Sequence, residues 1–255
     1  MTLIIPENII SLGRREAELR SASLAAISGD KMMSDHLDAV EAAMSAIMDH
    51  VRDRPERGEH ELIVKRLGIR LFNGLASGLS QGFAGYYQQA WDAVRDVVEL
   101  QFLFDDFSGD AEKVMRWATM PKAKREKEFR PGEVRKRLNE RYSHEGEKRR
   151  AAYQMLSTMA SHPSPDGFLL TMPKNDLSET GPFYEERFLR ALLGDMAQHG
   201  LAAAVNFTSL LPAATPWEQH AKRVFMQRGG KWLETYMGAA VAKVFADEAE
   251  GTSGA

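Results

Sequence analysis

Residues 70–104 read "RLFNGLASGLSQGFAGYYQQAWDAVRDVVELQFLF" and decide the fold. Gly74, Gly78 and Gly82 recur every four residues in this stretch, and aromatic and aliphatic residues follow them. Such a pattern fits a membrane helix, a phosphate-binding loop or a contact between two helices. A membrane-spanning helix needs about 20 mostly apolar residues, whereas residues 71–90 include several Asn, Ser and Gln side chains. We therefore expect no membrane span.

The glycines do not fit a phosphate-binding loop either. Such a loop follows a strand and carries G-x-x-x-x-G-K-[ST], but residues 61–72 have helical periodicity and that motif does not occur. Glycine in a helix costs about 1 kcal/mol relative to Ala, so the glycines between 68 and 85 indicate a packing or turning role. We predict close helix packing through Gly74 and Gly78, within the chain or against a second copy, and a helix break at 82–85.

Apolar residues recur at helical spacing along most of the chain. In "SDHLDAVEAAMSAIMDHVRDR", residues 34–54, they alternate three and four positions apart, and Ser34 is placed to cap the helix. The sequence "TPWE" predicts a capping box that starts a last helix at 215. The expected helices cover about 6–27, 34–51, 61–80, 84–107, 110–119, 131–142, 147–161, 183–210 and 215–247. We predict an all-α helical bundle with long central helices and a long loop near residues 163–182.

The composition fits a single globular domain spanning 1–255. The hydrophobic fraction of 44% and the charged fraction of 27% are ordinary for such a domain. The N-terminal helices would occupy 1–55 and a frayed tail 248–255. With no cysteine, the chain has no disulfide, thiolate metal site or cysteine nucleophile. The first residues do not resemble a signal peptide, so we expect a cytoplasmic protein.

Few residues have the spacing of a catalytic or metal site. None of the seven histidines follows an Asp or Glu by three positions, as di-metal bundles require, so we predict no metal and no cofactor. Arg95 and Glu99 lie one helical turn apart. They form either a local ion pair or an anion-binding arginine oriented by a carboxylate. His162 ends a helix and is either a general acid or base or a residue that offsets the helix dipole.

Positive charge is concentrated between residues 113 and 150. This block holds 14 Lys or Arg and 6 Glu, which is a net charge of +8. The other residues of the chain carry a net charge of −11, which gives the total of −3. A basic block binds nucleic acid through phosphates, or forms a solvated face with paired charges. The candidates for nucleic-acid contacts are Lys122, Lys124, Arg125, Arg135 and Arg137.

Three phrases together resemble one family. They are "YYQQAWDAVRDVVELQFLF" at 86–104, "KRRAAYQMLSTMASHPSP" at 148–165 and "GPFYEERFLRALLGDM" at 181–196. Over about residues 60–210 the chain is similar to uncharacterised bacterial all-α proteins related to the HEPN superfamily. The resemblance implies a compact helical bundle that is often a homodimer. It also implies RNA as a partner, since many members are metal-independent RNases of toxin–antitoxin or phage-defence systems.

Active members of that superfamily carry an arginine, four to six residues and then a histidine. The resemblance would make His162 that histidine, but Ser157 and its neighbours offer no arginine. Formal matches at Arg137–His144 and Arg54–His60 are about as many as chance provides. Arg137–His144 is therefore only a second choice.

Two functions of different classes follow from these patterns. The first is RNA binding or metal-independent RNA cleavage, with His162 as acid or base and Arg95 facing the phosphate, held by Glu99. The second is a non-catalytic interaction module that docks a partner through the glycine face and the basic block. A third function, the binding of a small molecule, is supported only by the 4 Trp and 13 Met. Such residues usually fill a core.

Overall fold

The structure, a computed structural model, describes residues 6–52, 54–142, 146–173, 177–211, 213 and 215–250. Over these residues it contains helices and no strand, which confirms the all-α prediction. The helices are α1 (Glu7–Gly29), α2 (Lys31–Val51), α3 (Glu59–Phe83), α4 (Tyr87–Phe107), α5 (Ala111–Thr119), α6 (Lys122–Phe129), α7 (Pro131–Arg141), α8 (Gly146–Leu156), α9 (Glu186–Leu210), α10 (Pro216–Tyr236) and α11 (Ala239–Glu250). A π-helical segment (Ser157–Ser161) continues α8, and a 3-10 helix (Pro165–Thr171) follows it.

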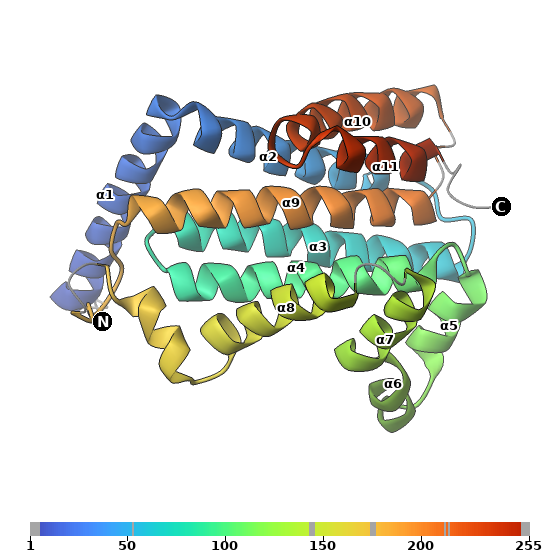
Figure 1. Cartoon of the computed structure of the whole chain (residues 1–255), viewed down its shortest axis with the longest axis horizontal. Helices are drawn as coiled ribbons and strands as arrows, with labels where there is room; N and C mark the ends of the chain where they lie inside the picture. The colour runs from blue at the N-terminus through green and yellow to red at the C-terminus, as the bar shows by residue number, and fades with distance from the viewer. Residues whose placement is uncertain are drawn as a thin grey trace, which may run out of the picture.

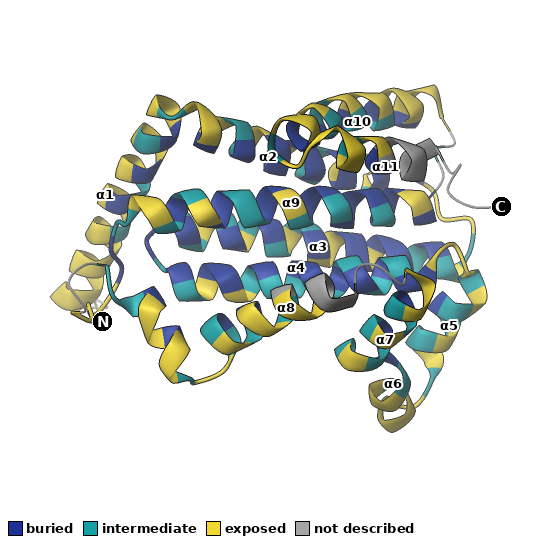
Figure 2. Cartoon of the chain, viewed as in Figure 1, coloured by how far each residue is buried: buried dark blue, intermediate teal, exposed yellow. Residues whose placement is uncertain are grey.

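The bundle is built around α9, which packs against α2, α3 and α4 (Figure 1). The faces that these helices turn toward one another carry the buried residues (Figure 2), among them Val40, Leu71, Phe104 and Phe207. α10 and α11 lie over α2 and α9, and α8 runs along α4. α5, α6 and α7 form a lobe that projects from one end of the bundle. None of the helices in the described ranges has the length and apolarity needed to cross a membrane.

The glycines of α3 bring its backbone close to its neighbours in the same chain. A Cβ added to Gly78 would lie 3.1 Å from Met196 Cε of α9, and one added to Gly74 would lie 3.4 Å from Val97 Cγ2 of α4. At Gly82 an added Cβ would overlap the Leu192 side chain. The predicted close packing is therefore confirmed and its partners are α4 and α9. Gly78 and Gly82 are buried inside the bundle, and the role of the glycine face in docking a partner stays a prediction.

The turn from α3 to α4 is set by Gly85. Its φ of +88° lies in the region that favours glycine. The Gly85 carbonyl accepts a hydrogen bond of 3.3 Å from the Phe183 amide, which joins the turn to the segment before α9. The helix break predicted for 82–85 is therefore confirmed, with α3 ending at Phe83.

Several helix ends differ from the predictions. Asp30, not Ser34, caps α2, because its carboxylate accepts a 2.9 Å hydrogen bond from the Met33 amide. The capping box of Thr215 and Glu218 is confirmed. The single helix predicted for 215–247 is wrong, because Gly238, with a φ of +92°, separates α10 from α11.

Two helices were not predicted at all. α6 reads "KAKREKEF" and buries only Phe129, so it has no apolar periodicity to reveal it. The 3-10 helix Pro165–Thr171 lies inside the predicted loop 163–182, of which residues 174–176 are outside the described part. Most of the predicted frayed tail, residues 251–255, is also outside it.

Candidate functional site

Arg95 and Glu99 of α4 meet Tyr153 of α8. Arg95 Nη2 donates to Glu99 Oε1 at 2.7 Å and to the Tyr153 hydroxyl at 3.1 Å. The Tyr153 hydroxyl donates to the same Glu99 oxygen at 2.8 Å. The predicted ion pair within α4 therefore exists, and a third residue from another helix fixes it. Burial would lower the pKa of Arg95, but Tyr153 and Glu99 outweigh it and raise that pKa.

Arg135 of α7 also reaches this cluster. Its guanidinium carbon lies 4.0 Å from the centre of the Tyr153 ring, and that of Arg95 lies 5.4 Å from it. Two cations thus share one aromatic ring, an arrangement worth about 0.5–2 kcal/mol for each contact. The structure therefore brings together three of the predicted site residues, Arg95, Glu99 and Arg135, around Tyr153. We call these four residues the Tyr153 cluster.

His162 lies at the end of the π-helical segment and is exposed. Its amide donates to the Ser157 carbonyl at 3.0 Å, but in the described part of the chain its ring has no hydrogen bond or ion pair. Its neighbour Ser161 donates to Asp92 of α4, whose Oδ1 lies 3.9 Å from Arg95 Nη1. No hydrogen bond or ion pair joins the His162 side chain to the Tyr153 cluster among these residues, and the acid–base and phosphate-binding pair stays a prediction.

A polar groove of about 660 Å³ runs between α3 and α4 beside the Tyr153 cluster. The ionisable residues that line it are Arg70, Asp92, Arg95, Asp96 and Glu99. Arg70 donates to both carboxylate oxygens of Asp96, with Nε at 3.0 Å from Oδ2. These lining residues are two arginines and three carboxylates, so the groove carries a net charge of −1. This balance is unfavourable for the phosphates of a nucleic acid.

Arg137 supports the lobe and does not face solvent as a free cation. Its Nε and Nη2 donate to the two oxygens of Asp106 at 2.9 and 2.7 Å, and its Nη1 donates to the Glu128 carbonyl at 2.8 Å. Asp106 is completely buried and also accepts from Lys113 at 2.8 Å. Three of the five N–H groups of Arg137 are therefore engaged inside the protein, and its contact with nucleic acid stays a prediction.

Two other arginine–histidine matches occur in the sequence, Arg137–His144 and Arg54–His60. His144 lies outside the described residues. Arg54 is buried between Glu218 at 3.2 Å and Glu61 at 3.5 Å, where it joins α3 to α10. This arginine therefore has a structural role.

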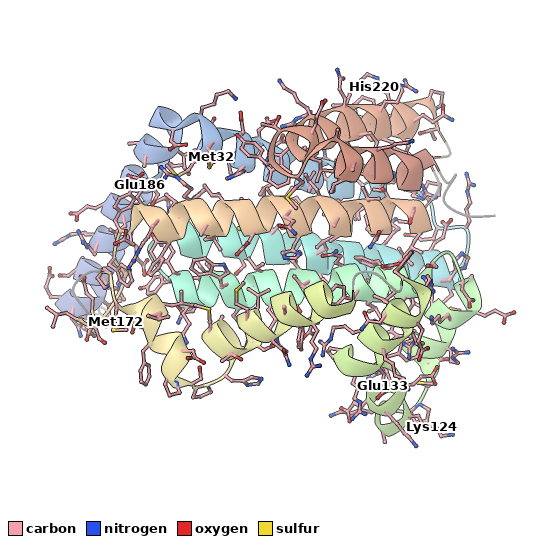
Figure 3. All side chains as sticks on the ribbon, viewed as in Figure 1. Met32, Lys124, Glu133, Met172, Glu186 and His220 are labelled. Carbon is pink, nitrogen blue, oxygen red and sulfur yellow. The ribbon has the colours of Figure 1, made fainter. Side chains whose placement is uncertain are left out.

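Lys122, Lys124 and Arg125 lie on α6, the outermost helix of the lobe. Lys122 and Lys124 are exposed and Arg125 is half-buried, and Lys124 points away from the bundle in Figure 3. Lys122 is 3.6 Å from Glu126, but both side chains are largely exposed, so this ion pair contributes little to stability. These three predicted residues are in a position to contact a partner.

Three histidines that the sequence analysis did not single out lie within the bundle: His36 and His50 are buried and His199 is half-buried. Trp232 Nε1 of α10 donates to His36 Nδ1 of α2 at 2.9 Å, which requires His36 to be neutral, because indole N–H is only a donor. His199 of α9 lies 3.1 Å from the Gln101 side-chain oxygen, and burial lowers its pKa to about 4. Burial also lowers the pKa of His50. The hydrogen-bond partners of His36 and His199 are 196 and 98 residues away in the sequence, so no local motif marks these two histidines.

These histidines predict a loss of stability in mild acid. A histidine whose pKa is lower in the folded state binds more protons when unfolded, so the free energy of unfolding falls as pH drops below about 6.5. For His199, with a folded pKa of about 4, the expected loss between pH 7.5 and 5 is about 2 kcal/mol. Urea unfolding across this range measures it. His199→Gln should flatten the profile, whereas His220→Gln, at an exposed position of α10 (Figure 3), should not. Equal profiles for both variants would contradict this assignment.

Comparisons of the chain with known protein families, with characterised proteins and with solved structures find no match. The relation to the HEPN superfamily and the cytoplasmic location therefore stay predictions.

Proposed function

We propose that the chain binds RNA through α6 and the adjoining surface of α7. The observation that carries this proposal is the exposure of α6, an eight-residue helix that presents Lys122, Lys124 and Arg125 and buries only Phe129. A helix with one buried side chain adds little to the core. Its exposed cations are the type of group that neutralises phosphates.

The charge distribution supports an orientation with the lobe toward RNA. Residues 122–141 contain nine Lys or Arg and four Glu, which is a net charge of +5. The rest of the chain carries a net charge of −8, which gives the total of −3. An acidic body repels a polyanion while a basic lobe attracts it, which steers the approach. Ion pairs such as Arg130–Glu133 at 2.7 Å reduce this attraction but leave its sign unchanged.

The proposal is for binding and not for cleavage. Arg95, predicted to face the phosphate, is bonded to Glu99 and Tyr153 and lines an acidic groove. A general acid or base must reach the reacting atoms within hydrogen-bonding distance, and the described contacts do not connect His162 to Arg95. Catalysis by His162, Arg95 and Glu99 therefore stays a prediction, as does the homodimer.

RNA binding is measured by the fluorescence anisotropy of a labelled oligouridine at several salt concentrations. The triple variant Lys122→Gln, Lys124→Gln, Arg125→Gln should bind at least about tenfold more weakly. Its slope of log K against log salt should be shallower by about 2, since each contact to a single strand contributes about 0.7. The matched control replaces Lys31, Arg223 and Lys231, exposed on α2 and α10, with Gln. It should keep most of the affinity.

Three outcomes would overturn the proposal. Equal weakening by both triple variants would show that only net charge matters. The lack of binding at low salt would favour the non-catalytic interaction module instead. EDTA-resistant loss of full-length RNA that disappears in His162→Ala would show that the chain is an RNase and not only a binder.

A further inference from the structure

A second, apolar chamber adjoins the polar groove. It has a volume of about 210 Å³ and lies where the lobe of α5, α6 and α7 meets α3 and α4. Its apolar walls include Leu103 of α4, Trp117 of α5, Phe129 of α6 and Val134 of α7. Arg70, Asp96 and Glu99 line both the chamber and the groove. The two spaces therefore adjoin at these charged residues, and we refer to them together as one pocket with a polar part and an apolar part.

The two carboxylates at this junction, Asp96 and Glu99, differ in how many of their oxygens already accept hydrogen bonds. Asp96 accepts from Arg70 at both oxygens. Glu99 accepts from Arg95 and Tyr153 at Oε1 alone, and none of the described residues donates to its Oε2. Glu99 is 29% exposed, so this oxygen belongs to a carboxylate that solvent and ligands can reach. A carboxylate oxygen is a strong acceptor for an ammonium group.

We infer that this pocket binds an organic cation, with an ammonium group on Glu99 and an aromatic or branched apolar group in the chamber. The groove's net charge of −1 favours a cation over an anion of the same shape. Trp117 and Phe129 line the chamber, and a contact between two aromatic rings contributes about 0.5–1.5 kcal/mol beyond the burial of area. The polar and apolar parts thus match the two ends of one amphiphilic cation.

This inference is independent of RNA binding. Neither Lys122 nor Lys124 nor Arg125 lines the pocket, and Phe129 is the one residue of α6 that does. Failure of the RNA-binding variants would leave the pocket unchanged, and failure of cation binding would leave the basic surface of α6 unchanged.

Two small probes of similar shape and opposite charge test the inference. The full chain is titrated with 2-phenylethylamine and, separately, with 3-phenylpropionate, and binding is followed by calorimetry and by tryptophan fluorescence. The amine should bind saturably and the acid at least about tenfold more weakly. Trp117→Phe should remove most of the fluorescence change, which places the probe in the chamber.

Variants identify the contacts. Glu99→Gln should weaken binding of the amine at least about tenfold, because it removes a charge-assisted hydrogen bond. Leu103→Trp should abolish binding by filling the chamber. If Glu99→Gln does not fold, this second variant still tests the inference. Glu234→Gln, at an exposed carboxylate of α10, is the matched control and should bind normally. Equal binding of amine and acid, no saturation by the amine, or unchanged affinity in folded Glu99→Gln would each overturn the inference.

Discussion

Asp106→Ala is expected to lower the free energy of unfolding by about 3–5 kcal/mol, because it removes the shared partner of two cations. Asp106 is completely buried, and it holds Lys113 at 2.8 Å and Arg137 at 2.7 Å. Burial would raise its pKa, but the hydrogen bonds from Arg137 and Lys113 outweigh burial and lower that pKa. Without the carboxylate, the Lys113 ammonium, whose side chain is 13% exposed, loses its ion-pair partner.

Urea unfolding at pH 7 measures this loss, and Glu133→Gln provides the control. Glu133 also pairs with an arginine of the lobe, Arg130 at 2.7 Å, but the arginine is 64% exposed. Removing an exposed pair costs at most about 1 kcal/mol. If the two variants lose the same stability, the ionic contacts of Asp106 are not what attaches the lobe to α4.

Gly85→Ala is expected to destabilise the bundle by about 3 kcal/mol or more, through strain and overlap together. The φ of +88° at Gly85 is unfavourable for any residue with a side chain. A Cβ at this position would also lie 2.8 Å from the Phe183 nitrogen and would overlap the Phe183 carbonyl oxygen. Backbone atoms do not move aside as a flexible side chain does, so the turn would separate from the segment before α9.

Gly109→Ala separates the two contributions. Gly109 follows α4 with a φ of +76°, and a Cβ there would have no atom within 4 Å. This variant should therefore lose only the conformational part, about 1–2 kcal/mol. Thermal and urea unfolding of both variants give the comparison. Equal losses would show that the contact between Gly85 and Phe183 does not contribute to stability.

The sequence revealed the helices that bury an apolar stripe. α2, α3, α4 and α9 have such stripes, and the capping box at Thr215 fixed the start of α10. α6 escaped prediction because a polar helix that buries one side chain lacks that periodicity. The prediction of Ser34 as a cap failed for another reason. Ser and Asp are both good caps, and the backbone places Asp30 at the start of α2.

The site was predictable only where its residues are close in sequence. Arg95 and Glu99 share a helix face, so their pairing followed from their spacing. Tyr153 joins them from 58 residues beyond Arg95, and Asp106 occupies Arg137 from 31 residues before it. Such contacts depend on how helices pack, which the spacing of residues in one helix does not determine. Within the basic block, for example, Arg137 is bonded to the buried Asp106, whereas Lys124 on the same lobe is exposed.

The central position of α9 has a consequence for synthesis on the ribosome. α2 buries its apolar face, including Val40 and Ile47, largely against α9, which ends only at Leu210. At about 5–20 residues per second, roughly 8–30 s separate the completion of α2 from that of α9. During this interval the nascent N-terminal helices expose the part of the apolar stripe of α2 that α9 later covers. Chaperone occupancy of the growing chain should thus persist until the second half has emerged.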